Sequence, residues 1–198
     1  IEPRHKPHAI PSNRNYTDNK GTFYVQNVYH GTHMAGVEPG TVKYLRVIES
    51  PEKRTWTKNG WGGQGEQAPA VNWHSFENKR ILGEVPVEED GSANFEVPSG
   101  TFVFFQLLDK DKKMIQSMRS GTMVMPGEIN GCIGCHEDQN QIPIPKRTIA
   151  SQTKPHRLQA PEGGVRSFTF DLEIQPILDR ACIACHNGEG KAFDLRGG

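Results

Sequence analysis

The sequence has no long apolar run, no excess of charge and no cysteine outside two short motifs. A transmembrane helix needs about 18 or more consecutive apolar residues, so no membrane span is expected in this chain. Its 23 basic and 23 acidic residues balance, which argues against nucleic acid as a partner. The chain opens at Ile1 without a methionine or a signal peptide, so we expect a processed or excerpted protein.

All the cysteines fall in two copies of one motif, C-x-x-C-H, and each copy ends in a histidine. The residues are Cys132, Cys135 and His136 in the first copy, and Cys182, Cys185 and His186 in the second. Two cysteines at this spacing form thioether bonds to the two vinyl groups of one haem, and the adjoining histidine ligates the iron. The motifs therefore predict two covalently bound haem c groups.

Two other kinds of site use paired cysteines. Two C-x-x-C pairs can hold one tetrahedral zinc, and a single pair can act as a redox dithiol. Neither requires a histidine directly after both pairs, so haem accounts for more of the pattern. Only 34% of the residues are hydrophobic and the mean hydropathy is −0.64, so two apolar haem discs would supplement the core. Thioether attachment also predicts a periplasmic, extracellular or equivalent non-cytoplasmic location.

Residues 21–140 are expected to form a mainly β, antiparallel, sandwich-like domain that carries the first haem. Apolar and polar residues alternate over 93–97, and Asp90-Gly91 before them is a hairpin turn. Further runs rich in aromatic and β-branched residues predict the other strands, at 22–28, 42–48, 79–87, 102–108 and 114–118.

Three other segments flank this domain. Residues 1–20 are polar and proline-rich and predict an extended N-terminal arm, and residues 141–166 predict a proline-rich linker. Residues 167–198 are expected to form a short helical, partial cytochrome c-like segment with the second haem. Its apolar residues recur on one helix face, at Ile174, Ile177, Leu178 and Ala181.

The sixth ligand of each iron decides whether a haem only carries electrons or also binds small molecules. His74 is the first choice for the first haem, because aromatic residues flank it and it follows a glycine-rich loop. A surface or hydrogen-bonded histidine is the alternative. Met123 and Met125 compete for the same iron, although methionine at such positions more often fills gaps in a core.

Four more histidines are weaker candidates for the second haem. His30 and His33 lie three apart in one loop, where a haem ligand, a metal pair or two ordinary surface histidines are the alternatives. His5 and His8 lie on the arm, which would let either ligate a haem of a neighbouring molecule. Such bridging would join identical subunits into an oligomer or filament.

Several stretches resemble the hydrazine synthase alpha subunit middle-domain family. The residues that carry the resemblance are Asn72-Trp73-His74, the run from Arg80 to Ala93, and the run from Met118 through Pro126-Gly127-Glu128 to Glu137. The tail, residues 174–186 and 193–197, resembles the cytochrome c domain that commonly follows. The resemblance implies a haem-bearing β module. In that family a tyrosine shortly after the motif is associated with the active-site iron, but Glu137-Asp138-Gln139-Asn140 stands here.

Three functions follow as hypotheses. The missing tyrosine and His74 favour a dihaem cytochrome without catalytic residues, which transfers electrons between redox protein partners. The alternative is a haem-bearing subunit or fragment of a hydrazine-synthase-like nitrogen-redox enzyme, with the first haem open to nitrogen-oxide or ammonia chemistry. The third is a module in which the haem only stabilises the fold.

Overall fold

The structure is a computed structural model that describes residues 13–51, 79–136, 140, 144–189 and 193–197. The chain divides into two compact units. The first unit comprises residues 1–47 and 83–159, and the second comprises residues 48–82 and 160–198. The first motif lies in the first unit and the second motif in the second.

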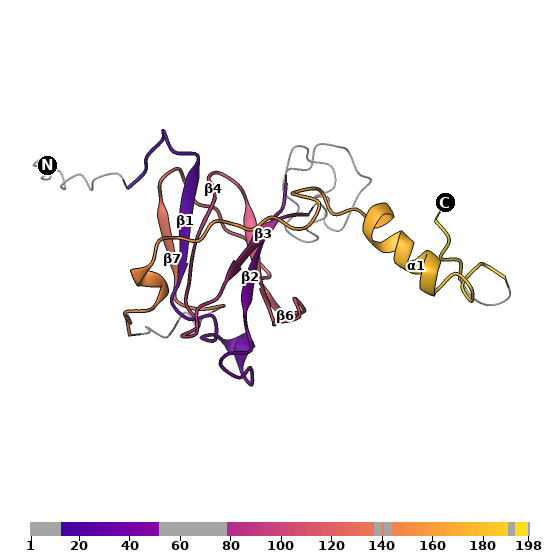
Figure 1. Cartoon of the computed structure of the whole chain (residues 1–198), viewed down its shortest axis with the longest axis horizontal. Helices are drawn as coiled ribbons and strands as arrows, with labels where there is room; N and C mark the ends of the chain where they lie inside the picture. The colour runs from indigo at the N-terminus through magenta and orange to yellow at the C-terminus, as the bar shows by residue number, and fades with distance from the viewer. Residues whose placement is uncertain (1–12, 52–78, 137–139, 141–143, 190–192, 198) are drawn as a thin grey trace, which may run out of the picture. The chain divides into compact units, whose positions relative to one another are not determined.

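The strands of the described structure form two β-sheets (Figure 1). The three-stranded sheet has the order β4-β1-β7, with β4 at Ala93–Pro98, β1 at Lys20–Val25 and β7 at Ile129–Cys132. The four-stranded sheet has the order β3-β2-β5-β6, with β3 at Arg80–Pro86, β2 at Tyr44–Glu49, β5 at Val103–Leu108 and β6 at Met114–Ser117. The prediction of a mainly β fold with antiparallel sheets is confirmed.

Three phenylalanines join the two sheets in one core. Phe23 of β1 and Phe95 of β4 are fully buried. The Phe105 ring, from β5 of the other sheet, lies edge-on to both, with centroid distances of 5.2 Å to Phe23 and 5.4 Å to Phe95. Phe23 and Phe95 come from alternating buried positions of β1 and β4, whereas Phe105 comes from β5, in which five of six residues are buried.

Strand β7 is an addition to the predicted set. It pairs parallel with β1, so that Val25 lies opposite Cys132 and Thr22 opposite Ile129. Its sequence, INGC, gives no β pattern because the strand is four residues long and contains a glycine. The parallel pairing of β7 with β1 carries the chain directly into the first motif.

The helices are short. A π-helical turn, η4, spans Phe170–Ile174 and leads into α1 at Gln175–Ala181, where a proline is tolerated in the first turn. Short 3₁₀ helices occur at Thr32–Met34 (η1) and Ala150–Gln152 (η3). The one short C-terminal helix agrees with the prediction. Among the described residues, no helix has the length and apolar character needed to cross a membrane.

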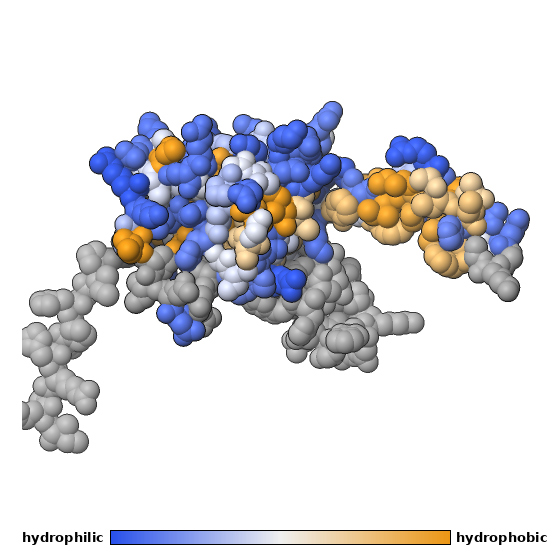
Figure 2. All heavy atoms as spheres, turned by 90° about the horizontal axis from the view of Figure 1, so that it is seen from below, coloured by the Kyte–Doolittle hydropathy of each residue, from blue (hydrophilic) through white to orange (hydrophobic). Residues whose placement is uncertain are grey.

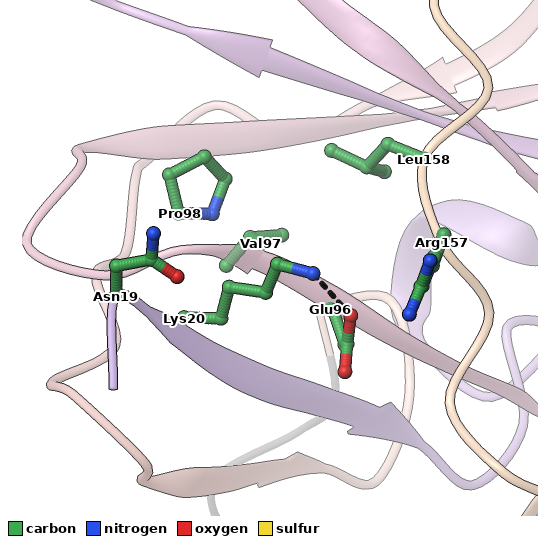
Figure 3. A pocket seen from close by; sticks show the side chains of 7 residues that line it. All are labelled: Asn19, Lys20, Glu96, Val97, Pro98, Arg157 and Leu158. Carbon is green, nitrogen blue, oxygen red and sulfur yellow. Dashed lines mark hydrogen bonds and ion pairs between the residues drawn. The ribbon is translucent and has the colours of Figure 1, made fainter. Parts of the chain in front are cut away.

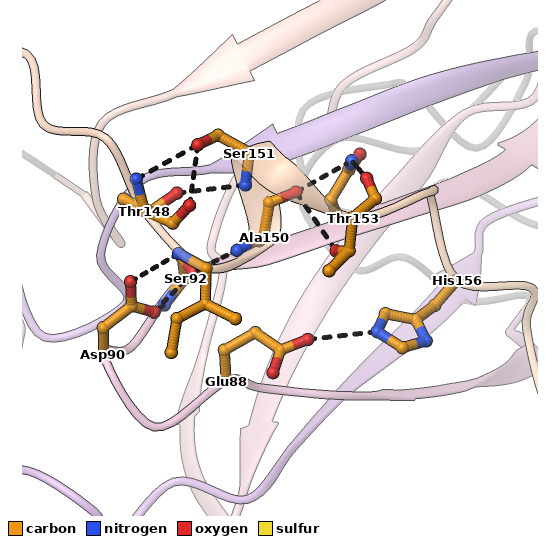
Figure 4. Close-up of polar contacts among 10 residues, drawn as sticks. Glu88, Asp90, Ser92, Thr148, Ala150, Ser151, Thr153 and His156 are labelled. Atoms are coloured by element: carbon orange, nitrogen blue, oxygen red, sulfur yellow. Dashed lines mark hydrogen bonds and ion pairs between the residues drawn. The ribbon is translucent and has the colours of Figure 1, made fainter.

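Residues 144–159 are fastened to the first unit by a polar network (Figure 4). The Ala150 N–H donates to Ser92 Oγ at 3.1 Å, and Ser92 Oγ donates to Asp90 at 2.5 Å. The Ile149 N–H donates to the other Asp90 oxygen at 2.8 Å. Ser92 is fully buried and Thr148 nearly so, and their hydroxyl groups take part in this network.

Candidate haem attachment sites

The first motif begins on β7. The residues that follow β7 run alongside the residues that follow β1. The Gln26 N–H donates to the Cys132 carbonyl at 2.9 Å, and the Asn27 N–H donates to the Ile133 carbonyl at 3.1 Å. These bonds prolong the β1–β7 pairing past the ends of both strands. The motif is therefore anchored to the sheet and not to a helix.

A pair of glycines brings the motif and the loop after β1 into close contact. A Cβ on Gly134 would lie 2.0 Å from the His30 carbonyl oxygen, and a Cβ on Gly31 would lie 2.1 Å from the Cys135 carbonyl oxygen. Gly31 also has a φ of 150°, which L side chains rarely adopt. Only glycine therefore allows the two backbones to approach this closely.

The histidine of the first motif has an unusual backbone. His136 has a φ of 64°, in the left-handed region, which is uncommon for residues other than glycine. Its carbonyl accepts a hydrogen bond from the Thr32 N–H at 3.4 Å, and the Cys135 N–H donates to the His30 carbonyl at 2.9 Å. The His33 ring lies against the His136 ring, with centroids 4.9 Å apart.

The second motif continues from α1 as a helical turn. The Cys182 N–H donates to the Leu178 carbonyl at 2.8 Å, and the His186 N–H donates to the Cys182 carbonyl at 3.0 Å. Both cysteines and the histidine are thus placed by a short helical extension. The two motifs share a sequence pattern but differ in backbone conformation.

His186 is held by the segment that follows it. The Leu195 N–H donates to the His186 carbonyl at 2.9 Å, and the Phe193 ring lies 4.7 Å from the His186 ring, centroid to centroid. His186 Nδ1 is buried and has no hydrogen-bond partner among the described residues. The second unit also exposes large apolar side chains around α1 (Figure 2). They are Phe168, Phe170, Leu172, Ile177 and Phe193.

Both motifs have the donor set that haem c requires. Each supplies two thiols three residues apart and one imidazole, and at least one thiol of each pair is partly exposed. In the first motif His136 is exposed at the surface, and the exposed apolar residues near the second motif suit a large apolar ligand. The residues present therefore fit a haem at each motif. Among the described side chains, no three of His, Cys, Asp or Glu are grouped as a metal ion would require.

The other predicted ligands are placed as follows. His30 and His33 lie beside the first motif, where the His30 carbonyl and the His33 ring make the contacts given above. Met125 lies close to Gly21, near the start of β1, so it sits away from the Val25–Cys132 end of the sheet. His74, His5 and His8 lie outside the described residues. Their roles as ligands stay predictions.

An open cleft of about 340 Å³ lies at the opposite end of β1 (Figure 3). Lys20 and Glu96 form an ion pair of 2.9 Å in it, and Arg157 lines it as well. Val25, which lies opposite Cys132, is five positions along β1 from Lys20, a distance of roughly 16 Å. The cleft is therefore separate from the first motif.

The sequence predicts the six motif residues as haem-binding residues but does not predict the loop that packs against the first motif. Gly31, Gly134 and Thr32 matter through contacts between segments about 100 residues apart in the sequence, as in the Cys135 to His30 bond. The available signal was the run His30-Gly31-Thr32-His33, in which a glycine between two histidines suggests a close backbone approach.

Comparisons with known proteins agree with the sequence resemblance. Residues 40–137 match the family described as the hydrazine synthase alpha subunit middle domain. A solved structure of Kuenenia stuttgartiensis hydrazine synthase is similar, with a TM-score of 0.65 and 18% sequence identity. The alignment covers 92% of this chain but only 31% of that chain, so this chain spans less than a third of its length. A search of curated proteins gives no match.

Proposed function

Because residues 40–137 belong to the hydrazine synthase alpha subunit middle-domain family, we propose that this chain is a haem-bearing part of a hydrazine-synthase-like nitrogen-redox enzyme. The family match, which ends at the first motif, is the observation that carries the proposal. It favours this function over the free-standing electron carrier. The proposal includes a protein partner, since the family is named for a subunit, and a non-cytoplasmic compartment, since thioether attachment takes place there.

The first motif would hold the haem at which small nitrogen compounds react. Cys132 and Cys135 would form its thioether bonds and His136 would provide the imidazole ligand. When bound, haem c supplies an iron that exchanges one electron at a time and accepts a small ligand where its sixth position is open. The surface position of His136 leaves room for a macrocycle and for access from solvent. His74 is the residue whose ligation would close that sixth position.

Electron relay is the second function, and the conformation of the second motif favours it. A short helix that delivers C-x-x-C-H is how small cytochrome c domains begin, and His186 follows α1 in that way. Phe193 packs on the His186 ring, which limits its rotation. Cys182 and Cys185 would hold a second haem, which would supply one-electron chemistry to this unit.

The test is spectroscopy of the full chain produced with a haem c maturation system. Intact-mass analysis should show two covalent haems. Electron paramagnetic resonance of the oxidised protein should show one high-spin centre that changes on addition of nitric oxide and one low-spin centre that does not. The Cys132→Ser/Cys135→Ser variant should lose the responsive centre and keep the other. Two low-spin centres that ignore nitric oxide would overturn the enzyme proposal in favour of electron transfer alone.

A further inference from the structure

His136 and His186 are positioned by different means. A helical hydrogen bond from the His186 N–H to the Cys182 carbonyl fixes the second histidine. In the first motif the backbone turns at His136, with a φ of 64°, and its neighbours are residues of the loop after β1. That loop therefore performs the positioning that a helix performs in the second motif.

His33 is the side chain of that loop that reaches the His136 ring. It belongs to the short helix η1, whose next residue, Met34, is only 3% exposed and anchors the helix in the core. The Thr32 N–H, one residue earlier, donates to the His136 carbonyl. Thus the backbone and the ring of His136 both contact η1, which fixes the position of His33 relative to His136.

The contact between the two rings is one of packing. The centroids lie 4.9 Å apart and the planes are inclined by 62°, which is the edge-to-face arrangement that aromatic rings prefer. Two imidazoles on opposite sides of one metal, with bonds of about 2 Å, would have centroids roughly 6 Å apart. His33 and His136 as placed are therefore not the two axial ligands of a single iron.

We infer that His33 is a positioning residue for the first haem: its ring, packed edge-to-face on His136, sets the orientation of the His136 imidazole toward the iron. This rests on the proposed function, because it requires a haem at Cys132 and Cys135. Partners that orient a ligating histidine determine how firmly it binds the metal and tune the metal's properties. Loss of the His33 ring should thus weaken the bond between His136 and the iron.

The experiment measures that bond with nitric oxide as the probe. The full chain carries Cys182→Ser/Cys185→Ser, so that only the first haem contributes, and is compared with added His33→Ala, His33→Gln and His33→Phe. His30→Ala is the matched control, because His30 contacts the motif through its backbone carbonyl. Ferrous haem with nitric oxide gives distinct six- and five-coordinate spectra, and the five-coordinate form has lost its histidine.

We expect His33→Ala and His33→Gln to raise the ratio of five- to six-coordinate nitrosyl by about two- to tenfold, the range of one edge-to-face ring contact. His33→Phe, which keeps a ring edge, and His30→Ala should match the parent. An unchanged ratio in His33→Ala, or equal ratios for His33→Phe and His33→Gln, overturns the inference. If His33→Ala loses the circular dichroism signal of the β-sheets, the comparison of His33→Phe with His33→Gln decides whether the inference holds. A parent without covalent haem overturns the proposed function itself.

Discussion

Asp90 is the residue on which the attachment of residues 144–159 most depends. It accepts hydrogen bonds from the Ser92 hydroxyl and N–H and from the Ile149 N–H. Burial alone would raise the pKa of Asp90, but the hydrogen bonds from Ser92 and Ile149 outweigh it and lower the pKa below its usual value. The ionised carboxylate is therefore favoured by the folded structure.

Replacement of Asp90 by asparagine should reveal how much the ionised carboxylate contributes to the free energy of unfolding, because that contribution depends on pH. A carboxylate whose pKa is lowered on folding adds stability above its unfolded pKa of about 4, and that stability is lost as the pH falls through the folded pKa. We expect Asp90→Asn to reduce the free energy of unfolding by about 1 kcal/mol at pH 7. The difference should shrink below about pH 4. Urea unfolding at both pH values tests this, with the exposed neighbour Glu89→Gln as control; a constant difference would contradict the assignment.

Sequence alone predicted the residues whose chemistry is local. The cysteines and the histidine of each motif lie within five residues, so their spacing predicts one ligand. The ring contact between His33 and His136 joins segments that are distant in sequence. No local pattern predicts a contact between these two residues, and from sequence alone His33 is a second-haem ligand, one half of a metal pair or an ordinary surface histidine.

The loop after β1, residues 26–32, binds the first motif, residues 132–136, and we call this contact the clamp. Four backbone hydrogen bonds join them, from Gln26, Asn27, Thr32 and Cys135. The glycines at 31 and 134 allow the distance between the two backbones that these bonds require. The clamp gives the first motif the rigidity that α1 gives the second.

A methyl group in this clamp should force it open. Gly134→Ala places a Cβ 2.0 Å from the His30 carbonyl oxygen, and such overpacking costs about 1–3 kcal/mol of stability. We expect a lower melting temperature and less covalent haem at Cys132 and Cys135, measured by calorimetry and by mass spectrometry of peptides. Gly131→Ala is the matched control, because its Cβ would meet nothing within 4 Å. Equal behaviour of the two variants would show that the clamp is not required.

The sequence predicts a strand well where its own residues form an apolar pattern. It predicts poorly a strand that forms only because it pairs with another strand. β4 was located to within a residue because its buried side chains recur at every second position, and β5 because it is a run of aromatic and aliphatic residues, five of which are buried. β7 depends on β1 for its hydrogen bonds and has no pattern of its own. Residues 144–159 read as a linker because of their prolines, yet buried Ser92 and Thr148 fasten them to the first unit.

The chain combines two units that stabilise their motifs in opposite ways. The first unit has an aromatic core and presents its motif at the edge of a sheet. In the second unit, α1 has seven residues and none of them is buried. Isolated helices shorter than about 12 residues are marginal in water. The second unit should therefore depend on its haem for structure, whereas the first should not.

Removal of the cysteines of one motif at a time tests this difference. Each of the double variants Cys132→Ser/Cys135→Ser and Cys182→Ser/Cys185→Ser should lose one haem by intact mass and keep the other. Without the second haem, amide hydrogens of α1 should exchange rapidly, because the apolar side chains around it lose their cover. Without the first haem, exchange in β1 and β4 should stay slow, since Phe23 and Phe95 remain buried in the protein core. Ala184→Ser, which changes the second motif between its cysteines, should keep both haems and the parent's exchange rates. Slow exchange of α1 in the variant without its haem would contradict the dependence, because it would show that the helix is stable without the ligand.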